Sequence, residues 1–406
     1  MNDISIIELG ARQVLLLSII VLWLGIFLTK KINFLNEFNI PAPVTGGLIC
    51  SVIVALLEIT TDIKVNFDLG LRDTLLLVFF STIGLSANIR LLVEGGKLLL
   101  IILAVATIYL VIQNSIGISV AMLIEGHPAY GLLAGSISFA GGHGTGITYG
   151  KLFSEQYGLS GAVEIAMACA TFGLIFGGLV GGPVAKFLIT KHNLKGDETV
   201  ASETPHPQHE SHGSFVNMDV IINATFVIAL CIGAGEHIHG WLKTNGITMP
   251  LYLPSLFVGI IITNVSDLLK IARTDRFINA IGLWSDVSLT LFLSMSLMSM
   301  QILILSNAIR PLLIVLTLQV VVMAFFAYFI VFRIAGKDYD AAVITAGFAG
   351  LGLGATPVGM ANMRALTTKY GASAKAFLII PLLGAFFIDI SNALVIQFFM
   401  GLPFLQ

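Results

Sequence analysis

The stretch FAGGHGTG, residues 139–146, interrupts a chain that is otherwise strongly apolar, and a second such stretch, FAGLGLGATP, occupies residues 348–357. Glycine permits positive φ angles and close contacts between chain segments, so each stretch predicts a break in a helix. Glycines also occur where membrane helices simply pack together. Two glycine-rich breaks in matching order favour a functional site over packing alone.

The composition around these breaks is that of a membrane protein. Of the 406 residues, 56% are hydrophobic and 11% are charged, and the mean hydropathy is +0.95. Soluble domains carry about 25% charged residues. The three cysteines lie far apart in apolar runs, so they predict neither disulfides nor a metal site, and no cofactor is expected. No basic stripe predicts binding to nucleic acid.

Ten apolar runs are long enough to cross a hydrocarbon core of about 30 Å. The five runs of the first half cover residues 13–29, 43–59, 73–89, 98–124 and 162–188. Those of the second half cover residues 218–235, 250–267, 280–302, 311–332 and 376–399. Between the halves, hydrophilic residues 189–217 predict a flexible linker. Its histidines at 206, 209 and 212 either belong to a plain linker or bind a metal.

The two halves, 1–188 and 218–406, resemble each other. Residues 72–86 match residues 285–299, and residues 38–53 match residues 247–262. Such duplications are common in transporters. Because each half has an odd number of spans, the second half is expected to be inverted. The predicted fold is an all-α polytopic membrane protein with two inverted repeats, each of five transmembrane helices plus one re-entrant hairpin.

The positive charges predict the orientation in the membrane. If the N-terminus is external, 15 of the 21 Lys and Arg residues lie in cytoplasmic segments and 6 in external ones. Cytoplasmic segments of membrane proteins carry the excess of Lys and Arg. We therefore expect both termini outside the cytoplasm and the linker inside it.

The predicted hairpins cover about 128–160 and 337–375, and the glycine-rich stretches form their tips. Irregular backbone within a membrane is tolerated only where protein or a water-filled cavity satisfies it. A helix that begins at such a tip presents N–H groups and a positive dipole end, whereas a helix that ends there presents carbonyl oxygens. Two opposed tips therefore predict a binding site for an anion and small cations.

Polar side chains near the tips are the candidate ligands. The expected substrate-binding residues are Gly142, His143, Gly144, Thr145, Gly354, Thr356, Asn362, Asp389 and Asn392. The expected Na⁺ ligands are Ser136, Ser138, Thr145, Thr356, Asn362 and Asp389. Hydroxyl, amide and carboxylate oxygens suit a hard cation. Acids inside membrane spans are costly and functional, so Asp389 is expected to meet an ammonium group or Na⁺.

Two charged residues near the tips have alternative roles. His143 either titrates or donates to a carboxylate, or it only shapes the loop. Arg364 lies eight residues past Thr356, about 12 Å along a helix, so it is expected to face the cytosol; the alternative is that it clamps a substrate carboxylate.

Three motifs together resemble the bacterial glutamate:sodium symporters of the ESS family. They are SFAGGHGTGITYG (138–150), GFAGLGLGATPVGMANM (347–363) and PLLGAFFIDISNALVIQ (381–397). The resemblance implies Na⁺-driven uptake of L-glutamate through loop tips that meet from opposite sides. It also implies a homodimer in the bacterial inner membrane and, by relation to citrate-type symporters, an elevator motion. In that membrane the orientation expected from the charges places both termini in the periplasm.

Other functions are compatible with the same architecture. A symporter of another carboxylate, such as citrate, would provide no ammonium group for Asp389. A channel also uses broken helices, but a buried acid and two unlike tips favour a closed site. An enzyme is not expected, because no nucleophile or metal ligand accompanies His143 at a known motif spacing.

Overall fold

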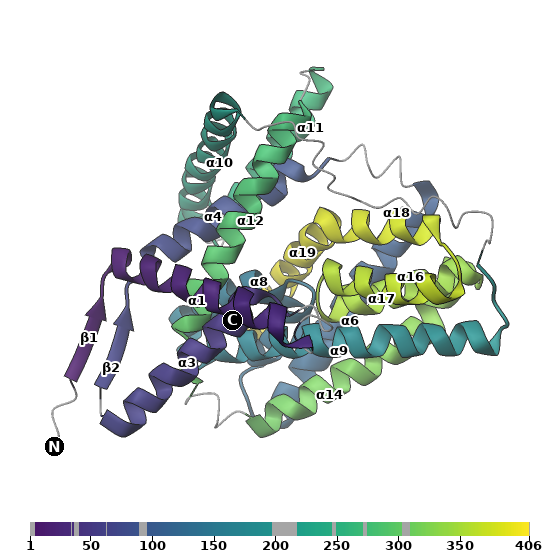
Figure 1. Ribbon diagram of the computed structural model, residues 1–406, viewed down its shortest axis with the longest axis horizontal. Coiled ribbons are helices and arrows are strands. Elements are labelled where there is room, and N and C mark those ends of the chain that lie inside the picture. The colour runs from purple at the N-terminus through teal and green to yellow at the C-terminus, as the bar shows by residue number, and fades with distance from the viewer. Residues whose placement is uncertain are drawn as a thin grey trace. The chain divides into compact units, whose positions relative to one another are not determined.

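The computed structural model describes residues 5–33, 35, 40–61, 63–88, 96–196, 217–245, 249–270, 274–302 and 309–405. Within these ranges, all ten predicted spans coincide with helical segments (Figure 1). Seven of the described helices are long and apolar enough to cross a membrane. They are α1 (Ala11–Lys31), α3 (Ala42–Thr61), α6 (Gly96–Leu123), α9 (Ala162–Lys191), α10 (Met218–Thr244), α12 (Asp275–Met298) and the helix Arg310–Ala335.

The remaining three predicted spans are short or interrupted helices. Both α4 (Gly70–Ser86) and α11 (Tyr252–Leu268) have 17 residues. The last span consists of α18 (Ala374–Leu382), a π-helical turn η5 (Leu383–Phe387) and α19 (Ile388–Met400). The protein is therefore a predominantly helical, multi-pass membrane protein.

The chain forms two compact units that interleave along the sequence. Unit 1 comprises Met1–Asn88, Ser154–Glu164 and Ser214–Asn307, and unit 2 comprises Ile89–Phe153, Ile165–Gly213 and Ala308–Gln406. Each unit thus takes elements from both halves of the chain. The division into repeats at 1–188 and 218–406 stays a prediction. Residues 197–216, which include the three linker histidines, lie outside the described residues.

Unit 1 contains a small parallel sheet that the all-α prediction did not include. The strands β1 (Ser5–Leu9) and β2 (Ile63–Phe67) pair in register from Ser5–Ile63 to Leu9–Phe67. In β2 the burial alternates along the strand, and isoleucine, valine and phenylalanine occupy the partly buried positions. This period of two, with β-branched and aromatic residues, favours a strand over a helix.

Unit 1 is otherwise built from packed helices. Helix α3 packs against α1 and α12, and α11 packs against α10 and α4. A buried apolar cluster, Leu85, Ala224, Ile228, Cys231, Ala280 and Ile281, joins α4, α10 and α12. A side-chain hydrogen bond also joins α11 to α4, because Thr263 Oγ1 donates to the Leu85 carbonyl at 2.7 Å. A polar side chain inside the membrane is thereby satisfied by a neighbouring helix.

The segments of the two predicted hairpins lie in unit 2, except for the end of the first one from Ser154 onward, which belongs to unit 1. The first consists of α7 (Pro128–Leu132), the irregular segment η1 (Leu133–Ile137) and α8 (Gly142–Tyr157). The second consists of α16 (Tyr339–Leu353) and α17 (Thr356–Tyr370), which pack against each other. The unit also holds α6, most of α9, α18, η5, α19, and a helix formed by α14 (Ile309–Phe326), the π turn η4 (Ala327–Val331) and α15 (Phe332–Ala335).

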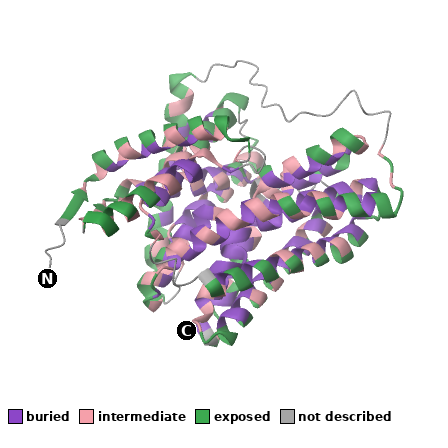
Figure 2. Cartoon of the chain, turned by 60° about the horizontal axis from the view of Figure 1, so that its bottom comes forward, coloured by how far each residue is buried: buried purple, intermediate pink, exposed green. Residues whose placement is uncertain are grey.

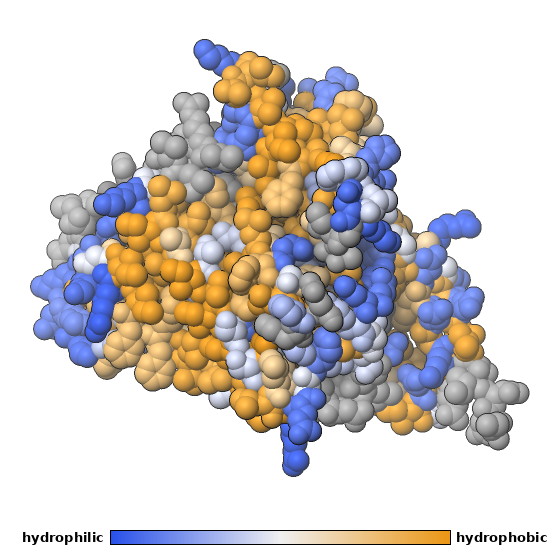
Figure 3. Space-filling model, turned by 180° about the vertical axis from the view of Figure 1, so that it is seen from behind, coloured by the Kyte–Doolittle hydropathy of each residue, from blue (hydrophilic) through white to orange (hydrophobic). Residues whose placement is uncertain are grey.

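The outer faces of many helices are apolar, as a lipid environment requires. Large exposed apolar side chains include Trp23 on α1, Phe226 on α10 and Phe398 on α19. Figure 2 shows buried residues along the facing sides of the helices and exposed residues along their outer sides. Apolar side chains cover broad areas of the face seen in Figure 3. In a water-soluble protein, contiguous patches of this kind would be unfavourable.

Candidate functional site

The first hairpin breaks at the predicted tip and also before it. Its second leg begins at Gly142, whose φ of +65° is readily adopted only by glycine. Earlier, the backbone leaves helical form at Ala134 (φ −86°, ψ 17°) and Gly135 (φ −116°, ψ −141°). The break at Gly135 was not predicted. It frees backbone groups that need other partners.

The second hairpin breaks within its predicted tip. Helix α16 ends at Leu353, Gly354 has φ −135° and ψ −83°, and Ala355 is extended. Helix α17 then begins at Thr356, followed by Pro357, which is favoured in a first turn because that turn needs no intrahelical N–H. The predicted arrangement of a helix C-terminus followed by a helix N-terminus is therefore present.

Two buried glutamines connect the breaks of the two hairpins. Gln319 Nε2, from α14, donates to the Ala134 carbonyl at 3.1 Å and to the Gln113 carbonyl at 2.8 Å. Gln113 Nε2, from α6, donates to the Gly352 carbonyl of the second hairpin at 3.1 Å. Both glutamines are fully buried. The two irregular segments thus converge in unit 2, and side-chain amides satisfy their exposed carbonyls.

Asparagines hold the first hairpin in a similar way. Asn114 Oδ1 accepts from the Ser136 backbone N–H at 2.8 Å, just past the break at Gly135. Asn392 Nδ2, from α19, donates to the Ser136 carbonyl at 3.1 Å. The predicted residues Ser136 and Asn392 are therefore in direct contact. Gly141 lies beside Thr145 and Asn392, because a Cβ there would approach both side chains within 2.8 Å.

This cluster contains buried polar atoms that have no hydrogen-bond partner among the described residues. Those from the convergence region are Gln113 Oε1, Asn114 Nδ2, Ser136 Oγ, Ser138 Oγ, Gln319 Oε1 and Asn392 Oδ1. Leaving a buried polar atom unpaired costs about 1–3 kcal/mol. Five of these six atoms are oxygens, the ligand type that hard cations prefer. These oxygen atoms are of the kind that would coordinate a small cation such as Na⁺.

His143 is buried and contacts α9. Its Nε2 lies 3.1 Å from Thr171 Oγ1, and Thr171 Oγ1 itself donates to the Met167 carbonyl at 2.9 Å. A hydroxyl has one hydrogen, so His143 Nε2–H must be the donor in this pair. The geometry supports the loop-shaping role of His143, because its Nε2–H is directed at α9.

The second hairpin's polar residues also bond to neighbouring elements. Thr356 Oγ1 donates to the Gly384 carbonyl in the π turn η5 at 3.0 Å. Asn362 Nδ2 donates to the Gly177 carbonyl of α9 at 2.9 Å. Of the two predicted tip residues, Thr356 is at the start of α17, whereas Asn362 is a turn and a half further on. Arg364 is exposed, which favours its solvent-facing role.

Asp389 lies in the first turn of α19, directly after η5. It is partly buried and makes no hydrogen bond or ion pair within the described part of the chain. Asn392 follows one turn later, so both side chains project from one side of α19. Gly144 and Thr145 are buried in the first turn of α8. All predicted site residues therefore belong to unit 2.

Sequence reasoning missed Gln319. The residue lies within LTLQVVVM, an apolar run in which one amide could equally face a neighbouring helix. Gln113 and Asn114 are polar residues in the middle of a predicted span, and the same signal marks Gln319. A polar side chain that far from both ends of a span must find a partner in the protein.

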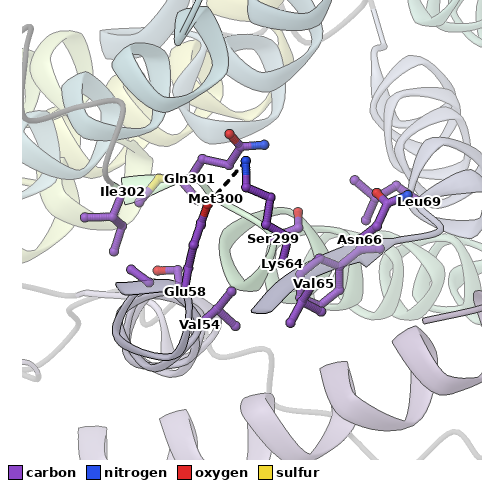
Figure 4. A pocket seen from close by; sticks show the side chains of 13 residues that line it. Val54, Glu58, Lys64, Val65, Asn66, Leu69, Ser299, Met300, Gln301 and Ile302 are labelled. Atoms are coloured by element: carbon purple, nitrogen blue, oxygen red, sulfur yellow. Dashed lines mark ion pairs between the residues drawn. The ribbon is translucent and has the colours of Figure 1, made fainter. Parts of the chain in front are cut away.

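Unit 1 has a separate pocket of about 420 Å³ (Figure 4). Its lining includes Glu58 of α3, Lys64 and Asn66 of β2, and Ser299 and Gln301 after α12. Glu58 and Lys64 are 3.6 Å apart and largely neutralise each other. None of the predicted site residues lines this pocket, so it is distinct from the convergence region in unit 2.

Comparison with known proteins assigns the family. Residues 7–372 match the family described as Sodium/glutamate symporter. The chain is 43% identical over 400 residues to the sodium/glutamate symporter of Escherichia coli (strain K12), which covers 98% of both chains. It is also 43% identical over 391 residues to that of Haemophilus influenzae, covering 95% of this chain and 96% of the relative. The chain therefore belongs to the sodium/glutamate symporter family, a family of transporters and not of enzymes.

Proposed function

We propose that the protein takes up L-glutamate together with Na⁺, and that the convergence region of unit 2 binds both. One observation carries this proposal. The Ala134 carbonyl accepts from Gln319 and the Gly352 carbonyl accepts from Gln113, and the two glutamines are bonded to each other. The same region contains buried oxygens without a hydrogen-bond partner among the described residues. Membership of the sodium/glutamate symporter family supports the same substrate and ion.

Each part of glutamate has a matching group in this region. The N-terminal ends of α8 and α17 provide backbone N–H groups and positive dipole ends for the carboxylates. Asp389 provides the negative charge for the ammonium group. Ser136, Ser138, Thr145, Thr356 and Asn362 remain the proposed oxygen ligands of Na⁺, together with Asp389. Binding of Na⁺ offsets the cost of placing an anionic substrate inside the membrane.

Two contacts in unit 1 support the proposed inverted repeats. Residues 47 and 256 are equivalent in the sequence alignment of the halves, as are residues 84 and 297. Gly47 faces the Leu297 side chain, and Gly84 faces the backbone carbonyl of Leu256. The same two pairs of equivalent positions thus meet in both contacts, which supports a duplication.

An elevator motion of unit 2 would provide alternating access. The two compact units support this mechanism, because every predicted site residue is in unit 2 and none is in unit 1. The expected setting is a homodimer in the bacterial inner membrane, with both termini in the periplasm and the linker in the cytoplasm. A membrane potential of 100 mV contributes about 2.3 kcal/mol per net charge moved inward.

Transport assays test this function. Proteoliposomes should accumulate radiolabelled L-glutamate under an inward Na⁺ gradient and show trans-stimulated exchange. Accumulation driven by a proton gradient and indifferent to Na⁺ would refute Na⁺ coupling, and absence of exchange would indicate a channel. Citrate uptake without glutamate uptake would identify the other carboxylate class.

Access to the site can be measured separately. In a cysteine-free background, Thr145→Cys should react with an impermeant maleimide from either side of the membrane, depending on the imposed gradients. Reaction from one side under every condition would contradict alternating access. Chemical cross-linking in native membranes should show a dimer.

A further inference from the structure

Unit 2 contains a groove on its surface that is separate from the proposed transport site. The groove measures about 420 Å³ and lies between α9 and the helix formed by α14, η4 and α15 (Figure 1). Its lining residues are Pro183, Val184, Phe187, Ala324, Phe325, Tyr328 and Phe329. Apart from the Tyr328 hydroxyl, these side chains are apolar. The volume is within the range of ligand-binding pockets, about 300–1,000 Å³.

The groove follows from the local structure of its two walls. One wall contains the π turn Ala327–Val331, and π turns change the direction of the side chains that follow. Tyr328 and Phe329 lie in this turn and line the groove. The opposite wall presents Phe187, whose ring centroid is 5.8 Å from that of Tyr328. The two walls run in the same direction, because Phe187 lies beside Tyr328 and, further along both helices, His192 lies beside Phe332.

Cationic side chains lie at one end of the groove. Lys191 Nζ donates to the Tyr328 hydroxyl at 2.7 Å and lies 5.5 Å from the Phe187 ring centroid. The guanidinium of Arg333 lies 5.6 Å from the ring centroid of Phe329. Each cation is thus held over an aromatic residue of the lining, within the range of cation–π attraction.

These cations are available to an anionic ligand. Neither Lys191 nor Arg333 forms an ion pair within the described ranges, and the nearby Asp338 pairs with Lys375 at 3.8 Å. The Lys191 ammonium has three N–H donors, and the Tyr328 hydroxyl occupies one of them. Both residues lie in the last turns of their helices, where a membrane helix meets the lipid headgroups.

We propose that this groove binds an anionic phospholipid. An acyl chain would lie along the apolar walls, and the phosphate would contact Lys191 and Arg333. Charge complementarity selects the ligand, because a zwitterionic lipid brings a positive choline group to the same two cations. A lipid bound here would contact α9, the helix that also contacts His143 and Asn362. This inference does not depend on the identity of the transported substrate.

Thermal unfolding of the full-length protein in a neutral detergent tests the proposal. Phosphatidylglycerol should raise the Tm in a saturable way, whereas phosphatidylcholine and inorganic phosphate should not. Each Lys or Arg near a membrane surface contributes about 1 kcal/mol to anionic lipid binding. The double variant Lys191→Gln, Arg333→Gln should therefore need about thirtyfold more phosphatidylglycerol for half the effect.

A matched control is available on α1. Lys31 Nζ lies 4.7 Å from the Phe27 ring centroid, with the same spacing of four residues as Lys191 and Phe187. Lys31→Gln should leave the phosphatidylglycerol effect unchanged, because neither Lys31 nor Phe27 lines the groove. An equal loss in Lys31→Gln would show a general charge effect and overturn the proposal.

A second variant tests the groove itself. Val184→Trp keeps both cations but places a large side chain among the lining residues, so it should abolish the lipid-induced rise in Tm. The comparison uses the lipid-induced shift rather than the absolute Tm, so that a change in basal stability does not interfere. Unchanged shifts in Val184→Trp and in the double variant, or stabilisation by phosphate alone, would refute the assignment.

Discussion

Gly47 of α3 packs directly on Leu297 of α12, so closely that a Cβ at Gly47 would clash with the leucine side chain. The counterpart pair has the two residue types exchanged: Leu256 is on α11, and Gly84 is on α4. At Gly47 the leucine side chain fills the space left by the glycine, whereas at Gly84 the backbone carbonyl of Leu256 does so. Small residues at such crossings let membrane helices approach closely.

We predict that Gly47→Leu destabilises the protein and that adding Leu297→Gly restores part of the loss. Overpacking a tight contact costs about 1–3 kcal/mol, and contacting residues show coupling of about 0.5–3 kcal/mol. The double variant has leucine on α3 and glycine on α12, the residue types found at the equivalent positions of α11 and α4. Thermal unfolding of the two single variants and the double variant measures the coupling.

Gly282 provides the control for this cycle. It lies in α12, and apart from its own helical turn no atom of the described residues lies within 4 Å of the position where its Cβ would be. Gly282→Ala should be neutral or stabilising, since alanine favours a helix over glycine by about 1 kcal/mol. Additive effects of the Gly47 and Leu297 substitutions would show that this contact does not determine the packing.

Gln319→Met should abolish most uptake while the protein still inserts. The substitution keeps the side-chain length but removes the two bonds to Ala134 and Gln113, and unpaired buried carbonyls cost about 1–3 kcal/mol each. The measurement is Na⁺-dependent glutamate uptake, normalised to the protein in the membrane. Ser115→Ala is the control, because Ser115 is exposed on α6 and bonds only within its helix. Normal uptake by Gln319→Met would show that the link between the hairpins is dispensable.

Asp389→Asn should remove glutamate uptake without loss of expression. The amide keeps the size of the carboxylate but cannot neutralise an ammonium group or Na⁺. Loss of a hydrogen bond to a charged partner costs about 1.5–3 kcal/mol, or at least about tenfold in affinity.

A binding experiment separates the two roles of Asp389. Binding of glutamate and of glutarate, which lacks the ammonium group, should be compared by calorimetry. If the variant binds both ligands more weakly and to the same extent, Asp389 coordinates Na⁺. If the variant binds both ligands as the wild type does, Asp389 binds neither the ammonium group nor Na⁺. Asp219→Asn, at the exposed start of α10, is the control.

His143→Leu and Thr171→Val should have similar and non-additive effects on uptake. Each substitution removes the same hydrogen bond, from His143 Nε2–H to Thr171 Oγ1. If His143 only shapes the loop, the double variant is no worse than either single variant. A His143 variant that is much worse than Thr171→Val would instead assign the imidazole a direct role with substrate.

Part of the site was accessible from sequence and part was not. The tips at Gly142 and Gly354 were predicted because the conformational freedom of glycine breaks a helix locally, whatever the rest of the chain does. Two features join residues far apart in the chain: the contact between Ser136 and Asn392, and the chain of bonds from Ala134 through Gln319 and Gln113 to Gly352. No local pattern encodes the partner of a buried amide, so these pairs could not be predicted.

The amino-acid sequence by itself determined the helices, the membrane setting and the two glycine-rich breaks. The apolar character of a span and the conformational freedom of a glycine are both local properties that need no distant partner. The family membership was also evident from three motifs. Only the tertiary structure decided that elements of both halves interleave into two units, and that Gln113 and Gln319 satisfy the broken backbone. The physical reason is that inside a membrane each exposed carbonyl must find a donor within the protein, and the fold alone decides which donor is within reach.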